Sequence, residues 1–147
     1  MRYRDAIEKY FLIDEAKSGE LVEFKFRPVQ QRYYEQLVKD YDIEKNGLTI
    51  PIREIILKAR KEGFTSLILG LFAVDDLMTE NPTETLIISY KDDATDQFRK
   101  RYRLFLTSYL ARKSGVAVEE IKKNPGILDV FAKQYFSVDS AGEYELK

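Results

Sequence analysis

The stretch LKARKEGFTS, residues 57–66, constrains the fold of this chain more than any other, because it separates a short β-favouring run from a long apolar segment. The run before it, residues 54–57, is rich in β-branched and aliphatic side chains. The segment after it, SLILGLFAV, is apolar nearly all round, which suits a buried helix. A strand, a loop and a buried helix in this order predict an α/β fold with the loop opening directly into the helix.

The loop departs from the phosphate-binding pattern GxxxxGK[ST], in which backbone N–H groups wrap the phosphates, a lysine neutralises them and a hydroxyl holds magnesium. Gly63 and Thr65 occupy the places of the last glycine and of the Ser/Thr residue. Phe64 occupies the lysine place and Lys58 that of the first glycine, with Arg60 two residues further on. The loop therefore keeps the last glycine and the hydroxyl of the pattern, and its basic residues, Lys58 and Arg60, stand at its beginning.

With this loop the chain resembles the large subunit of tailed-phage terminases, the ATP-driven motors that package double-stranded DNA into procapsids. One loop variant of that family is K-x-R-x-x-G-[hydrophobic]-[ST]-[ST], which the segment from Lys58 to Ser66 matches. The family also places F-x-[apolar]-x-P-x-Q before a helix, and FKFRPVQ, ending at Gln30, matches it. TLIISYKDDATDQFRKRYRLFL is similar to the family's next strand and helix, so the similarity covers roughly residues 10–110.

The resemblance implies a P-loop NTPase-like sheet flanked by helices, in the N-terminal segment of an ATPase domain without its nuclease domain. It assigns adenine recognition to Gln30, phosphate neutralisation to Lys58 and Arg60, and Mg²⁺ coordination to the Thr65 hydroxyl, with ATP as the nucleotide. The implied nucleotide-binding residues are Gln30, Lys58, Ala59, Arg60, Lys61, Glu62, Gly63, Phe64, Thr65 and Ser66.

The implied function is that of a viral DNA-packaging motor, which couples ATP hydrolysis to translocation of double-stranded DNA. The implied partners are double-stranded DNA, the portal protein and the small terminase subunit, with the motor subunits forming a homo-oligomeric ring. The implied location is the host cytoplasm, without membrane attachment or secretion.

Two features depart from the family's pattern. Lys61 and Glu62 stand where an amide and an apolar residue are expected. A carboxylate ~4 Å from a phosphate costs about 1 kcal/mol per charge pair in water and about 4 kcal/mol at a near-surface dielectric, so Glu62 is expected to point away from the nucleotide. The second departure is the missing Walker B strand: the only similar stretch, LFAVDD at residues 71–76, cannot be a separate strand, because residues 65–74 are needed for the helix after the loop. We therefore expect nucleotide binding without turnover, and no catalytic residue.

Composition bounds the class of protein. A length of 147 residues predicts a single domain over residues 1–147. An apolar content of 44%, with ten tyrosines and nine phenylalanines, excludes a disordered chain, and no apolar run approaches the ~20 residues of a membrane helix. The absence of cysteine and histidine excludes disulfides, zinc sites and catalysis by either residue.

Charge and the N-terminus limit partners and location. A net charge of −1 lacks the basic footprint of a domain that grips DNA broadly, so DNA binding is implied by the resemblance alone. The first residues, MRYRDAIEKYF, mix acids with apolar residues, unlike a secretory signal.

Periodicity and turn residues predict the other elements. A helix opening at Pro28 should present Val29, Tyr33, Leu37 and Tyr41 on one apolar face. Asn46-Gly47 and residues 17–20 should form turns, the latter before an extended LVEFKF. Further helices are expected at 5–10, 65–74, from 92 or 93 to 113, and within AVEEIKK, and further strands at 54–57 and 85–90.

The long helix that opens at Asp92 or Asp93 should bury one aromatic face and end before Gly115. The expected face comprises Phe98, Tyr102, Phe105, Tyr109 and Leu110. Its basic cluster RKRYR, residues 99–103, is either a contact for DNA phosphates or another subunit or, more commonly, a solvated helix face. A final hairpin around residues 139–142, whose last strand reaches the end of the chain, suggests an incomplete domain.

Each candidate residue also has a structural interpretation. Lys58 and Arg60 could be solvated bases after an edge strand, Gly63 a plain helix-start turn, and Gln30 a surface amide. Two other functions stay open. One is a helicase-like P-loop remodeller, whose loop would normally keep the lysine that Phe64 replaces. The other is a non-catalytic interaction module with a degenerate loop, which nucleotide binding would distinguish from both.

Overall fold

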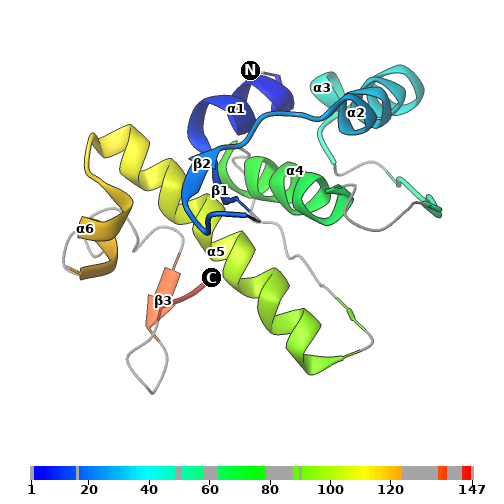
Figure 1. Ribbon diagram of the computed structural model, residues 1–147. Coiled ribbons are helices and arrows are strands. Elements are labelled where there is room, and N and C mark those ends of the chain that lie inside the picture. Colours follow the sequence, from blue (N-terminus) through cyan, green and yellow to red (C-terminus); the bar gives the residue numbers. More distant parts are fainter. Residues whose placement is uncertain are drawn as a thin grey trace. The chain divides into compact units, whose positions relative to one another are not determined.

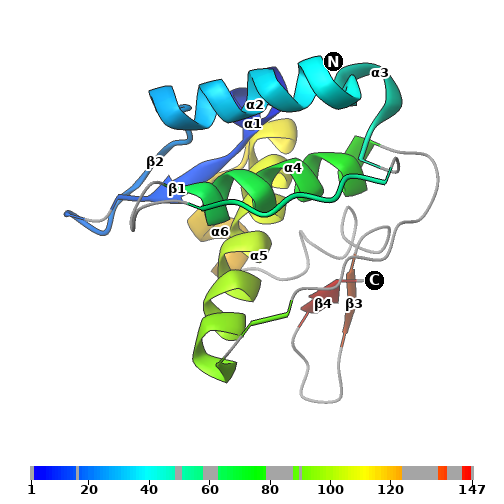
Figure 2. The ribbon, with the colours of Figure 1, turned by 90° about the vertical axis from the view of Figure 1, so that its right-hand side faces the viewer.

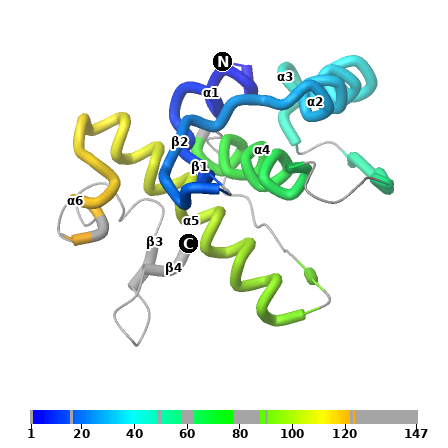
Figure 3. The backbone as a smooth tube through the Cα atoms, viewed as in Figure 1, coloured from blue at the N-terminus to red at the C-terminus, as the bar shows by residue number. Residues whose placement is uncertain are grey.

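The structure is a computed structural model that describes residues 2–15, 17–48, 51–57, 63–78, 88–89, 91–123, 136–138 and 144–146, drawn in colour along the chain in Figure 3. The chain divides into two compact units, Met1–Leu106 and Thr107–Lys147. One long helix, α5 (Asp92–Ser114), contributes its first part to one unit and its last part to the other.

The first unit is mainly helical. Besides the start of α5 it contains α1 (Tyr3–Tyr10), β1 (Leu12–Asp14), β2 (Leu21–Glu23), α2 (Pro28–Tyr41), α3 (Ile43–Asn46) and α4 (Phe64–Met78). Strands β1 and β2 form an antiparallel hairpin in which Ile13 pairs with Val22. The predicted turn at 17–20 joins them, with Gly19 at φ +69°, whereas the extended LVEFKF is a strand only over its first three residues.

The core of the first unit lies where α1, β2, α4 and the middle of α5 meet. Helix α1 packs against α4 and β2. Phe105 stacks on Phe11 with ring centroids 4.9 Å apart and on Phe24 at 5.7 Å, and all three are buried. Full burial of a large apolar side chain contributes about 1.5–3 kcal/mol, so such residues hold these elements together.

Helix α2 begins at Pro28 as predicted, but its buried face is rotated by about one residue. The buried residues are Gln30, Tyr34 and Leu37, whereas the predicted Tyr33 is only half-buried. Tyr34 faces inward because its hydroxyl finds partners there: it donates to Glu44 Oε1 at 2.6 Å and accepts from the Arg4 backbone N–H at 3.4 Å. Apolar periodicity alone places Tyr34 outside this face.

Helix α4 confirms the predicted buried helix after the loop and extends it to Met78. Leu67, Leu71 and Val74 are buried along it. Asp75 and Asp76 lie in its last turn, which confirms that LFAVDD is not a strand. Helices α2 and α4 run side by side in the two ribbon views (Figures 1 and 2).

The strand predicted at residues 54–57 is absent. Residues 51–57 form neither helix nor ladder, and Ile55 and Leu57 are each 95% exposed. The β preference of such side chains reflects packing on neighbouring strands, and the described residues supply no neighbour. Most of the strand predicted at 85–90 lies outside the described residues; Ile88 and Ser89 are described and form no strand.

The two sheets of the described residues are both two-stranded and antiparallel. The structure therefore confirms a chain with both helices and strands. The P-loop sheet flanked by helices stays a prediction.

The second unit follows the sequence predictions closely. Helix α5 ends at Ser114, directly before Gly115 at φ +73°, and Tyr109 and Leu110 of its predicted face are buried. Helix α6 (Val118–Lys123) is the short helix expected within AVEEIKK. Strands β3 (Phe136–Val138) and β4 (Tyr144–Leu146) pair antiparallel, which confirms the hairpin. Its turn lies outside the described residues, as does Asn124-Pro125-Gly126, where the sequence predicts a break after the short helix.

Candidate nucleotide-binding site

The structure describes half of the predicted site. Lys58, Ala59, Arg60, Lys61 and Glu62 lie outside the described residues. The described members are Gln30, Gly63, Phe64, Thr65 and Ser66, of which the last three form the first turn of α4.

Gln30 and Gly63, 33 residues apart in the sequence, are in direct contact. Gln30 Nε2 donates a hydrogen bond to the Gly63 carbonyl at 2.7 Å. Gln30 Oε1 accepts one from the backbone N–H of Arg27, the residue before α2, at 2.8 Å. Only this orientation of the amide gives a donor to the carbonyl and an acceptor to the N–H. One side chain thus joins the start of α2 to the start of α4.

Gln30 is 2% exposed, so its interpretation as a surface amide is wrong. The amide can be buried because its oxygen and its nitrogen are both hydrogen-bonded to backbone groups. These bonds offset the free-energy cost of removing a polar group from water.

Gly63 sets the geometry at the loop's end. Its φ of +77° is in the left-handed region, which favours glycine. A Cβ at this position would lie 2.6 Å from Gln30 Nε2, closer than real Cβ contacts allow. The Gly63 carbonyl also accepts the first helical bond of α4, from Leu67 N at 3.1 Å. The backbone conformation therefore favours glycine, and any side chain at this position would also have to displace the Gln30 amide.

The three side chains in the first turn of α4 differ in their exposure to solvent. Phe64 and Ser66 are buried, whereas Thr65 is half-buried. Thr65 is therefore the more accessible of the two hydroxyls, as its predicted role requires. The first N–H groups of a helix have no partner within the helix and carry partial positive charge, so this turn has the polarity that anions prefer.

Phe64, which stands in the lysine place, packs against α2. Its ring lies 5.4 Å from that of Tyr33, centroid to centroid. The Tyr33 hydroxyl donates to Glu54 Oε2 at 2.6 Å, and burial, followed by this hydrogen bond, raises the pKa of Tyr33 above its usual value. Tyr33 therefore stays a neutral donor and links the segment before the loop to α2. No local sequence signal marks the pairing of Tyr33 with Glu54.

The two carboxylates at the end of α4 have structural partners. Asp75 is buried, and its Oδ1 accepts from Tyr3 OH at 2.6 Å and from the Leu48 backbone N–H at 3.3 Å. Asp76 accepts a hydrogen bond from the Tyr102 hydroxyl. These contacts tie α4 to α1 and α5 within the first unit.

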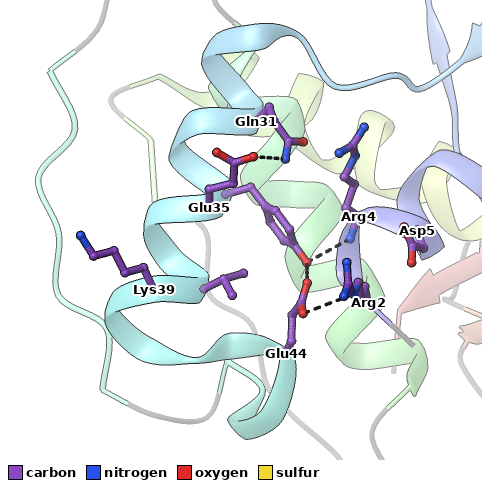
Figure 4. Close-up of a pocket in the computed structure, with 9 residues that line it drawn as sticks. Arg2, Arg4, Asp5, Gln31, Glu35, Lys39 and Glu44 are labelled. Carbon is purple, nitrogen blue, oxygen red and sulfur yellow. Dashed lines mark hydrogen bonds and ion pairs between the residues drawn. The ribbon is translucent and has the colours of Figure 1, made fainter.

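A pocket of about 480 Å³ lies between α1, α2 and α3 (Figure 4). Side chains of both charges line it, and two of them form an ion pair, with Arg2 Nε 3.7 Å from Glu44 Oε2. Gln31 lines the pocket, and its Nε2 donates to Glu35 Oε1 at 2.7 Å. None of the predicted site residues lines this pocket.

The basic cluster on α5 is partly a solvated face. Arg99 and Lys100 are exposed, Arg101 and Arg103 are half-buried, and Tyr102 is buried.

Within the described ranges no three acidic side chains gather to form a metal site, and no helix has the length and apolarity to cross a membrane.

The chain matches no protein-family model, no curated protein and no solved structure.

Proposed function

We propose that this chain is the nucleotide-binding part of a viral DNA-packaging motor of the terminase large-subunit type. The observation that carries the proposal is the bond between Gln30 and Gly63. The resemblance rests on two separate motifs, FKFRPVQ and KARKEGFTS, each of which assigns residues to one nucleotide site. Direct contact between the end of one motif and the glycine of the other is what a shared site requires.

The proposed binding mode follows from the start of α4. Lys58 and Arg60 neutralise the phosphates, and backbone N–H groups from Arg60 to Thr65 surround them. Mg²⁺ would be held by the Thr65 hydroxyl and by phosphate oxygens, and not by Asp75 or Asp76, which lie at the opposite end of α4. When bound, Mg²⁺ would neutralise phosphate charge.

In the complete motor, ATP hydrolysis would drive translocation of double-stranded DNA, with the portal protein and the small terminase subunit as partners and a ring of subunits as the assembly. This chain contributes nucleotide binding. Its two acidic residues nearest to a Walker B pattern are already bonded to Tyr3 and Tyr102.

A second candidate is a non-catalytic interaction module with a degenerate loop. The specific observation in its favour is Phe64, whose ring packs on Tyr33 in place of a phosphate-binding lysine. The two candidates differ in one property, the binding of Mg-ATP.

Calorimetric titration of Mg-ATP tests the proposal. We expect the wild-type chain to bind, and Lys58→Ala, Arg60→Ala and Thr65→Ala each to weaken binding about 10- to 100-fold, since hydrogen bonds to charged groups contribute about 1.5–3 kcal/mol. Matched controls are Arg99→Ala and Lys100→Ala, which remove exposed bases from α5 and should leave the affinity unchanged. A folded wild type that binds no Mg-ATP would reject the proposal in favour of the interaction module.

A further inference from the structure

We infer that Gln30 is a positioning residue for the phosphate loop, so that binding of phosphates depends on it even when the ligand has no base. This inference rests on the proposed function. It assigns to Gln30 a role that adenine recognition does not include, namely holding the carbonyl at the end of the loop in place.

The first support is the way in which the amide is used. Gln30 Oε1 is bonded at the start of α2, and Nε2 is bonded at the start of α4, at 2.8 Å and 2.7 Å. Helix α2 is anchored in the first unit by the buried side chains of Tyr34 and Leu37. The hydrogen bond from Gln30 therefore holds the Gly63 carbonyl at a fixed place relative to α2. The same carbonyl accepts the first helical bond, from Leu67 N. The orientation of the first turn of α4 therefore depends on the Gln30 side chain.

The second support is burial. With 2% of its surface exposed, Gln30 cannot be reached by a base in this conformation. Base recognition would require its amide to leave Gly63 or the surrounding residues to open. In this conformation the amide bonds to Gly63 at the end of the loop.

The third support is steric. The space beside Gly63 is filled by the amide, since a Cβ there would approach Nε2 to 2.6 Å. The absence of a side chain at Gly63 therefore leaves room for the Gln30 amide to reach the Gly63 carbonyl.

The test compares Mg-ATP with Mg-tripolyphosphate, which carries phosphates and no base, on Gln30→Met. Methionine keeps a similar volume and removes both hydrogen bonds. We expect affinity for both ligands to fall by a similar factor, about 5- to 10-fold, as for loss of the hydrogen bond to the Gly63 carbonyl, the one of the two that reaches the loop. The matched control is Gln31→Met, the neighbouring residue on α2, whose bond goes to Glu35; it should change neither affinity. Weakened Mg-ATP binding with unchanged tripolyphosphate binding would overturn the inference and leave Gln30 as a reader of the base.

A second measurement keeps the inference testable if the proposed function fails. Hydrogen exchange of the Leu67 amide, whose acceptor is the Gly63 carbonyl, needs no ligand. We expect exchange about 5- to 10-fold faster in Gln30→Met than in Gln31→Met. If the wild type binds neither ligand, the proposed function is rejected; unchanged Leu67 exchange would reject the positioning role by itself.

Discussion

At the scale of single residues, one buried amide and one glycine determine the geometry at the candidate site. The Gly63 carbonyl receives two hydrogen bonds, one from the Gln30 side chain and one from the Leu67 backbone. A side chain at position 63 would be strained by the φ of +77°, and its Cβ, 2.6 Å from Gln30 Nε2, would also displace the Gln30 amide.

These two obstacles can be measured separately by comparing glycines. Gly63→Ala should lower the free energy of unfolding by about 2–4 kcal/mol, because it combines left-handed strain of about 1–2 kcal/mol with the displaced Gln30 amide. Gly19→Ala has a similar φ of +69° and nothing within 4 Å of an added Cβ, so it should cost only the strain. Urea denaturation of the two variants measures the difference. Equal losses would show that the Gln30 contact contributes nothing at position 63.

At the scale of elements, the helices follow from local signals and the segment before the loop does not. Helix α2 opens at a proline, and α5 begins with acids and ends before a glycine. Residues 51–57 carry equally clear β-favouring side chains, yet Ile55 and Leu57 are 95% exposed. A helix satisfies its own backbone, whereas a strand needs a neighbour.

Paired leucine substitutions test this description of residues 51–57. Leu57→Ala should change the free energy of unfolding by less than about 0.5 kcal/mol, as expected for an exposed side chain. The same substitution at fully buried Leu67 on α4 should cost about 2–5 kcal/mol. Urea denaturation gives both values. A loss of 2 kcal/mol or more, on the same scale, at Leu57 would mean that this segment packs in a strand as the sequence predicts.

At the scale of the whole molecule, buried tyrosines bonded to carboxylates connect elements of the first unit. Tyr3 on α1 bonds to Asp75 on α4, 72 residues away, and Tyr102 on α5 bonds to Asp76. Burial raises the pKa of Tyr3, Tyr34 and Tyr102, and the carboxylate that each hydroxyl contacts raises it further.

These raised pKa values predict a loss of stability in alkaline solution. The unfolded chain deprotonates its tyrosines above the ordinary pKa of about 10, while the folded chain keeps them protonated. The unfolded state then binds fewer protons, so the free energy of unfolding falls as pH rises above about 10 and is independent of these groups below it. Denaturant titrations between about pH 8 and 11.5 measure this slope around that pKa.

Tyr3→Phe identifies one contributor to the slope. At pH 7 it should cost about 1–3 kcal/mol, because it removes one of the donors to buried Asp75. Above about pH 10 its stability should fall less steeply than that of the wild type, since one buried phenol is gone. Parallel curves over the whole pH range would show that Tyr3 takes no part in the alkaline transition.

Some features of this protein follow from the sequence by itself. The helix after the loop, the start of α2, the ends of α5 and the C-terminal hairpin are confirmed, because caps, apolar runs and turn residues act over a few neighbouring residues. The same reasoning excluded a strand at LFAVDD, residues 71–76, and it selected Gly63 and Thr65 at the start of α4.

Only the tertiary structure decided the rest. That Gln30 is buried, that Phe64 packs on Tyr33 and that the described residues 51–57 form no strand all depend on residues distant in the sequence. Periodicity gave the wrong face for α2 because Tyr34 and Gln30 are polar residues that face inward for hydrogen bonds to Glu44 and Gly63. The partner of a buried polar group is set by folding in three dimensions, and no pattern within a single helix contains it.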